Sequence, residues 1–210
     1  MKIILFHYPW YHHPNIQPAI KIINNRGKTM DHQDYSLYSG GLKGAEEAFG
    51  ECAEKFGIKE INFSFEGHTL SRNKNITMLS DAELNKGNIS MEIVSVRMGR
   101  RYAQADKIRK VFQTIFHMVN KGYQVFAVGF IQADGTVKGG TGWGVELAKF
   151  FNRPVSVFDQ ESNQWYAWKQ SEWVQEIPTI THKTFCGTGT RHLSDHGRKA
   201  IEDLFNRSFS

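Results

Sequence analysis

The chain has 210 residues and a mass of 24.1 kDa, enough for one generous domain or two cramped ones, and a chain of this length buries about 70% of its unfolded surface. It is 40% hydrophobic and 22% charged with a mean hydropathy of -0.46, which excludes both intrinsic disorder and a membrane-embedded protein. The net charge of +5 favours anionic ligands in a general way.

The two cysteines, Cys52 and Cys186, lie far apart, so the sequence offers neither a disulfide framework nor a multi-cysteine metal site. A reducing cytoplasm is therefore the expected location. The sequence contains no run of five or six like charges, so a scattered, solvated surface is favoured over a nucleic-acid track.

The first segment, 1–6, is apolar, and we interpret it as a strand rather than an export signal because His7 and Pro9 interrupt it. Residues 11–34 show no sustained periodicity and are expected to form an arm or extended loop. We therefore divide the chain into an N-terminal strand and arm, 1–34, and a single domain, 35–210.

The domain begins with a pattern typical of a βαβ unit. Residues 35–38 are β-prone, 39–41 form a tight turn, 43–56 carry apolar residues at helical spacing, and 58–65 alternate as a second strand. A strand, a turn, a helix and a strand in this order predict one βαβ unit.

The middle of the chain is less regular. Residues 69–99 show no clear pattern beyond a helix N-cap at Ser80. An amphipathic helix is expected over 101–120, followed by a nearly continuous apolar strand over 123–129, typical of the middle of a parallel sheet. Asp134 and Gly135 then indicate a hairpin-like flap.

A second glycine-rich loop, 138–146, leads into a helix that ends near residue 151 and a buried strand over 154–158. The two units together predict an α/β, Rossmann-like fold with an open, mainly parallel sheet and helices on both faces. In the tail we expect a tryptophan-rich cluster over 165–173, a small-residue turn over 187–191 and a last helix over 194–205.

Each glycine-rich loop follows a strand and opens a helix, so backbone N–H groups and the positive helix end are available for a phosphate. The alternative is that the glycines only permit tight turns. Neither loop is a Walker A or a G-x-G-x-x-G fingerprint, and the chain has no G-x-S-x-G nucleophile elbow. A P-loop kinase and a nicotinamide dehydrogenase are therefore disfavoured.

Charged residues near the second loop extend this hypothesis. Glu146 stands in the first turn of the following helix, where it either meets a ligand or only favours the helix dipole. Arg109 and Lys110 on the preceding helix either complement a phosphate or are ordinary surface cations. His192 and His196 are four residues apart, but a solvated pair is favoured over a metal site, and no metal or cofactor is predicted.

The residues Ser39-Gly40-Gly41-x-Lys43-Gly44, followed by Val128-Gly129 and Gly139-Gly140-Thr141-Gly142-Trp143-Gly144-Val145-Glu146, resemble the SLOG superfamily, the Rossmann-like proteins named for the SMF/DprA and LOG groups. The resemblance is best over 36–160. It implies a dimeric protein, and in the LOG group a phosphoribohydrolase that cleaves the N-glycosidic bond of nucleoside 5′-monophosphates.

The resemblance assigns Glu146 and Arg109 to catalysis. The ligand-binding residues expected from the loops and the helix before the second loop are Ser39, Gly40, Gly41, Lys43, Gly44, Lys110, Gly139, Gly140, Thr141, Gly142 and Trp143. This chain departs from the LOG signature because Lys138 stands in place of a proline and Trp143 in place of a threonine. The ligand is therefore expected to differ from that of the LOG enzymes.

Three functions follow from these residues. The first is a homodimeric sensor or sequestering protein that binds a nucleotide or a nucleotide-derived small molecule, and the second is a LOG-like hydrolase. The third, DNA binding as in the DprA group, has only the basic charge in its favour. No membrane partner is expected.

Overall fold

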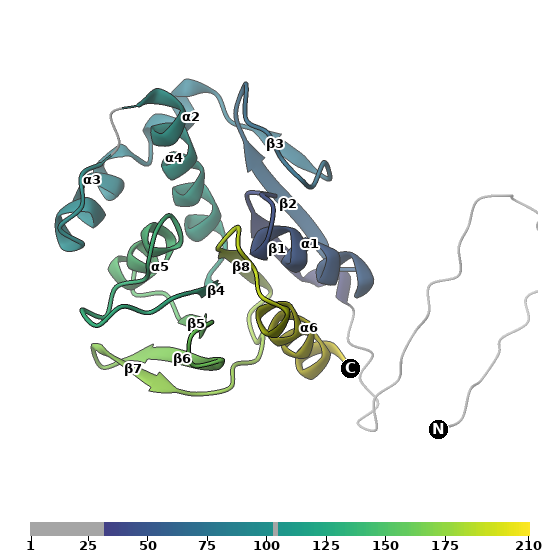
Figure 1. Ribbon diagram of the computed structural model, residues 1–210. Helices are drawn as coiled ribbons and strands as arrows, with labels where there is room; N and C mark the ends of the chain where they lie inside the picture. Colours follow the sequence, from purple (N-terminus) through teal and green to yellow (C-terminus); the bar gives the residue numbers. More distant parts are fainter. Residues whose placement is uncertain (1–31, 103–104) are drawn as a thin grey trace, which may run out of the picture. The chain divides into compact units, whose positions relative to one another are not determined.

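An eight-stranded sheet forms the centre of the computed structural model, which describes residues 32–102 and 105–210 (Figure 1). The strands lie in the order β3-β2-β1-β8-β4-β5-β6-β7. The strands from β3 to β5 in this order pair in parallel, whereas β6 pairs antiparallel with both β5 and β7. The strands are β1 (Ser36–Ser39), β2 (Lys59–Ser64), β3 (Ile76–Met78), β4 (Gln124–Gly129), β5 (Val155–Asp159), β6 (Gln164–Lys169), β7 (Glu172–Gln175) and β8 (Thr184–Gly189).

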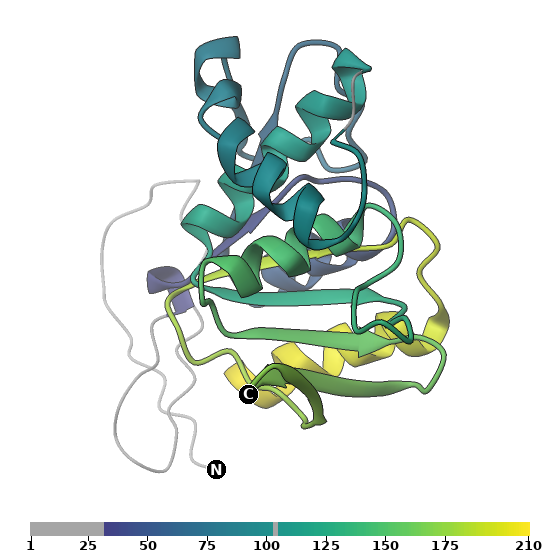
Figure 2. The same ribbon diagram turned by 90° about the vertical axis from the view of Figure 1, so that its left-hand side faces the viewer.

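Helices cover both faces of this sheet, as the sequence predicts. Figures 1 and 2 show α1 (Ala45–Lys55) and α6 (Asp195–Phe209) on one face, and α3 (Asn88–Arg97), α4 (Asp106–Lys121) and α5 (Thr141–Phe150) on the other. The short helix α2 (Asp81–Asn85) packs beside α4. The open, mainly parallel α/β sheet is thereby confirmed.

The central strands are apolar on both sides because each face of the sheet has its own core. In β4, Val125 and Ala127 belong to the core under α3, α4 and α5, whereas Phe126 and Val128 belong to the core under α1 and α6. This alternation follows from the two-residue period of a strand. It explains the continuous apolar run over 123–129, which fits a strand covered on both faces.

The expected βαβ units are both present. Strands β1 and β2 are parallel neighbours joined through α1, and β4 and β5 are parallel neighbours joined through α5. The flap predicted at Asp134 and Gly135 is an excursion closed by an antiparallel bridge between Ile131 and Val137. The predicted strand over 1–6 and the arm as far as residue 31 lie outside the described residues.

The small-residue turn expected over 187–191 is wrong in part, because Gly187–Gly189 form the end of β8 in the middle of the sheet. Glycines are rare in strands, which hid this element from the sequence pattern. Gly187 is required here because a Cβ atom at this position would lie 2.5 Å from the ring of Phe49 on α1.

The stretch 69–99 is more regular than the sequence indicates. Ser80 caps α2 as expected, since its Oγ accepts a hydrogen bond from the backbone N–H of Glu83 at 3.3 Å. Helix α3 was not expected, because it carries apolar residues on both its buried face (Met91 and Val94) and its exposed face (Ile89 and Val96). Its sequence therefore lacks the helical period that marks a half-buried helix.

Within the described residues, none of the helices is both long and apolar enough to cross a lipid bilayer.

Candidate functional site

A cavity of about 550 Å³ opens over the carboxyl ends of the central strands. Gly40 follows β1, residues 188–192 end and follow β8, and Gly129 and Phe130 end and follow β4. The connection after β1 leads to β2 on one side, and the connection after β4 leads to β5 on the other. This is the topological switch point at which open α/β sheets bind ligands, and the volume lies in the range of small-molecule sites.

One wall of the cavity is apolar, and it comes from α4. The side chains on this wall are Ile108, Val111, Phe112, Ile115 and Met118. Their spacing places them along one face of the helix, whose apolar stripe continues into the core below. A flat, apolar group such as a nucleobase fits against such a wall.

The second glycine loop supplies open hydrogen-bond donors. Gly139 and Gly140 line the cavity, and among the described residues no protein acceptor takes up their backbone N–H groups. Thr141 follows as the first residue of α5, a helix of ten residues, and also lines the cavity. The first turn of a helix presents such N–H groups to an anion.

In the first glycine loop, backbone N–H groups donate hydrogen bonds to glutamate side chains of the protein itself. The N–H of Leu42 donates to Glu46 Oε2 at 3.1 Å, and the N–H of Gly44 donates to Glu47 Oε2 at 3.5 Å. Of this loop, Gly40 and Leu42 line the cavity. Two amides that a phosphate would use are therefore already bound to carboxylates.

Glu46 is the acid that lines the cavity. Its Oε1 accepts a hydrogen bond from Thr188 Oγ1 at 2.9 Å, and its side chain is buried. Burial raises the pKa of this carboxyl to about 7, against the opposing effect of hydrogen bonds from Leu42 and Thr188 and the charge of Arg191. A carboxyl that titrates near neutrality in a cavity is a recognised mark of a functional group.

Three basic residues gather at the cavity: Lys138, Arg191 and His192. All three are exposed, and among the described residues none has an acidic partner within ion-pair distance. Lys138 comes directly before Gly139 and Gly140, so a cation and two open amides lie at adjacent positions. The chemistry at this side of the cavity is that of an anion site.

Arg100 holds the second glycine loop in place. Its guanidinium donates to the carbonyl oxygens of Gly139 at 3.2 Å and Val137 at 3.0 Å, and to Gln132 Oε1 at 2.9 Å. These bonds join the loop to the flap. Arg100 therefore positions the loop through its backbone.

Glu146 does not line the cavity. Its Oε1 accepts a hydrogen bond from Arg97 Nε at 2.7 Å, and Lys149 Nζ lies 3.6 Å from its Oε2. Lys149 in turn lies over the rings of Trp168 and Trp173, at 3.6 and 4.7 Å from their centroids. The structure thus places Glu146 in an ion-pair cluster that joins α3, α5 and the β6–β7 hairpin.

Arg109 and Lys110 also point elsewhere. Arg109 lies over the ring of Tyr102 and 3.7 Å from Glu92, and Lys110 lies 2.9 Å from Asp81. Neither residue lines the cavity.

The other expected ligand-binding residues fall into three groups. Gly40, Gly139, Gly140 and Thr141 line the cavity. Ser39, Gly41 and Gly44 are buried beside it without lining it, and Lys43 is exposed. Gly142 is buried, and a Cβ atom there would lie 2.1 Å from the carbonyl oxygen of Val137. Trp143 is buried in the core, and its ring is stacked on that of Phe112 with 4.2 Å between the centroids.

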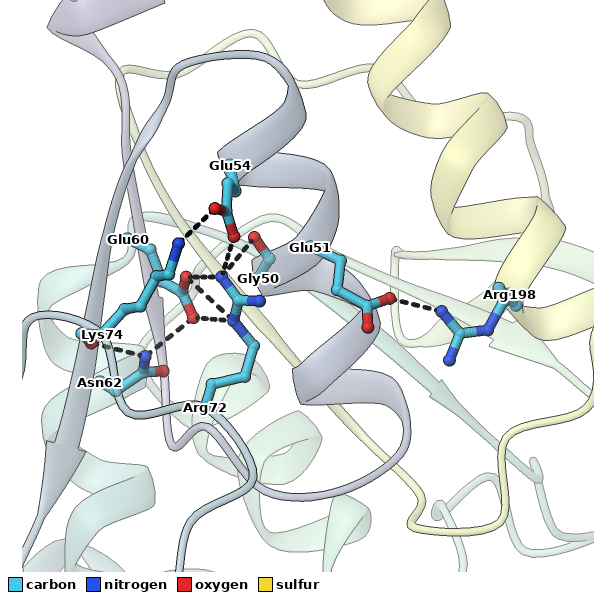
Figure 3. Close-up of polar contacts among 8 residues, drawn as sticks. All are labelled: Gly50, Glu51, Glu54, Glu60, Asn62, Arg72, Lys74 and Arg198. Atoms are coloured by element: carbon cyan, nitrogen blue, oxygen red, sulfur yellow. Dashed lines mark hydrogen bonds and ion pairs between the residues drawn. The ribbon is translucent and has the colours of Figure 1, made fainter.

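A cluster of charged residues around Arg72 (Figure 3) is connected to the first glycine loop through the backbone of Arg72. The carbonyl oxygen of Gly41 accepts hydrogen bonds from the N–H groups of Ser71 and Arg72. The Arg72 side chain pairs with Glu60 at 2.5 Å and Glu54 at 3.1 Å, and Glu60 is buried. The cluster fixes the segment that carries Gly41, and it therefore has a structural role.

Sequence reasoning missed Glu46, Thr188 and the apolar wall of α4 as parts of the site. In sequence, Glu46 looks like any acid in the first turn of a helix, and only its contact with Thr188 on β8 reveals its burial. No family model, curated protein or solved structure matches this chain.

Proposed function

We propose that the protein binds a nucleotide or a nucleotide-derived small molecule in the cavity over β1, β8 and β4. The observation that carries the proposal is one cavity with an anion-binding side, made of the open amides of Gly139 and Gly140 beside Lys138, and an apolar wall. A nucleotide has the same division into a phosphate and a flat base.

In this arrangement the phosphate accepts hydrogen bonds from Gly139 and Gly140 and is neutralised by Lys138. The base packs against α4, near Phe112 and Ile108. Glu46 lies at the first glycine loop, where its carboxyl group accepts from or donates to a sugar hydroxyl. The resemblance to the SLOG superfamily supports the same ligand class.

The position of Glu46 favours one alternative, hydrolysis of the N-glycosidic bond. In that reaction the bond between sugar C1′ and the base nitrogen breaks, and water adds at C1′ while the base leaves with a proton. A carboxyl with a pKa of about 7 is suited to exchange a proton with the water or the leaving base. We assign this role to Glu46 rather than Glu146, because Glu46 lines the cavity.

The test is to incubate the protein with nucleoside 5′-monophosphates of the four common bases and to follow thermal shift and base release together. A ligand-induced rise in the melting temperature without base release supports a binding protein, and base release supports the hydrolase. Lys138→Gln is expected to weaken binding about tenfold through loss of one charge-assisted contact.

Arg153→Gln is the matched control for charge. Arg153 lies outside the cavity and its guanidinium lies 5.0 Å from the ring centroid of Tyr123. Absence of a thermal shift with every nucleotide would refute the proposed function.

A further inference from the structure

A second hollow of about 480 Å³ lies next to the cavity and shares part of its wall. Gly139, Gly140, Ile108 and Phe112 line both spaces. The glycine pair therefore belongs to the walls of both spaces.

Two arginines, Arg100 and Arg101, line the second hollow, and none of the described residues that line it is acidic. Gln132 also lines it, but its Oε1 already accepts a hydrogen bond from Arg100 at 2.9 Å. Arg101 is exposed, and within the described residues no acid lies within ion-pair distance of it. Within residues 32–102 and 105–210, the lining of the hollow is therefore positively charged and has no acidic counter-charge.

The cavity and the hollow each carry cationic side chains, and a single phosphate contacts only one of the two sets. A phosphate on the amides of Gly139 and Gly140 meets Lys138 from the side of the cavity. A second anionic group on the same ligand can extend past these glycines toward Arg101, because Gly139 and Gly140 line both spaces. A Cβ atom at either glycine would have no neighbour within 4 Å, so there is open space for a ligand here.

We propose that the second hollow is an anion subsite, and that the ligand carries at least two linked phosphates, as in a nucleoside diphosphate or a dinucleotide. This inference rests on the proposed function and adds the number of charged groups to it. Arg101 is the residue that contacts the second phosphate, and Arg100 shapes the hollow while it holds the flap.

The experiment compares the dissociation constants of nucleoside 5′-monophosphates and 5′-diphosphates of the same base, at one pH and one salt concentration. In the parent protein the diphosphate is expected to bind about tenfold or more tightly than the monophosphate, since an arginine–phosphate contact is charge-assisted. In Arg101→Gln this advantage falls to about twofold, while the monophosphate affinity is unchanged.

Arg153→Gln removes the same charge from a site outside both spaces and is expected to keep the full advantage of the diphosphate. A dinucleotide probe, two adenosines joined by a 5′,5′-pyrophosphate, distinguishes the two ligand types. Tighter binding than adenosine diphosphate, with the same sensitivity to Arg101→Gln, identifies a dinucleotide, and weaker binding identifies a diphosphate.

The inference is overturned if the diphosphate has no advantage in the parent protein, or if Arg101→Gln and Arg153→Gln reduce it equally. In both cases the monophosphates still bind, and the proposed function stands. If the parent protein binds no nucleotide at all, both proposals are refuted. This result differs from the two above, in which the monophosphates still bind.

Discussion

The hydroxyl of Thr188 donates a hydrogen bond to Glu46 at 2.9 Å, which joins the end of β8 to the first turn of α1 beneath the cavity. Both side chains are buried. The bond orients the carboxyl at the first glycine loop, and burial sets its ionisation. We therefore expect the stability of the fold and the affinity of the proposed site to depend on the same proton.

Glu46→Gln is expected to change how stability depends on pH. The pKa of Glu46 is about 7 in the folded protein and near 4.5 as its ordinary value, so the folded state holds a proton that the unfolded state has released between these pH values. The contribution of this group to stability is present below pH 4.5 and is lost as the pH rises through 7.

The glutamine variant cannot ionise, so its stability relative to the parent should increase by roughly 3 kcal/mol between these two pH values. Denaturant unfolding of both proteins at several pH values measures this difference. A constant difference across the range would show that burial does not govern the ionisation of Glu46.

Binding of a phosphate-bearing ligand is expected to weaken as the pH rises from 6 to 8. An ionised Glu46 repels an anion in the cavity that it lines, whereas the neutral carboxyl does not. Titration calorimetry of the parent protein and Glu46→Gln measures the effect, which the glutamine variant should largely lose. His192 lines the same cavity, so His192→Asn is the companion variant, and a pH dependence that disappears only there would assign the proton to the histidine.

Arg72→Ala is expected to destabilise the fold by about 3–5 kcal/mol, because it leaves the buried carboxylate of Glu60 without its charged partner. Chemical denaturation gives the change in unfolding free energy. The matched control is Arg198→Ala, which breaks the exposed pair with Glu51 at 2.5 Å and should cost about 1 kcal/mol or less. Equal losses of unfolding free energy for the two variants would mean that the buried Glu60–Arg72 pair stabilises the fold no more than the exposed pair.

Glu146→Gln separates a structural from a catalytic role for that residue. We expect a lower melting temperature, because the variant weakens the contacts with Arg97 and Lys149. The nucleotide affinity should stay within about twofold of the parent value, since Glu146 does not line the cavity. A loss of turnover or affinity without a loss of stability would return Glu146 to the active site that the resemblance implies.

The sheet could be predicted in large part from local patterns. The units β1-α1-β2 and β4-α5-β5 have clear strand and helix periods, and the structure has both. Strand β8 could not be predicted, because its glycines permit close packing against distant residues: Gly187 against Phe49 on α1, and Gly189 against Val128 and Ala45. The need for glycine at these positions comes from contacts between segments that are far apart in sequence, so a local sequence pattern does not predict it.

Less of the candidate site than of the sheet could be predicted. The loop Gly139–Gly140 lies on the cavity because strand, loop and helix follow one another in sequence. Glu146 stands five residues beyond Thr141, which is a rotation of about 140° around the helix axis, so it faces α3 and Arg97 when Thr141 faces the cavity. The rotational setting of a helix depends on its neighbours, and the sequence of α5 alone does not contain it.

Strand β8 lies between β1 and β4 and pairs with both, although it comes from the last part of the chain. On a ribosome, the half-sheets β3-β2-β1 and β4-β5-β6-β7 are both made before the strand that joins them. The long-range pairing that closes the sheet therefore comes late in synthesis. The cavity is lined by residues that follow all three central strands, so a nascent chain has no complete cavity until β8 and the loop after it are in place.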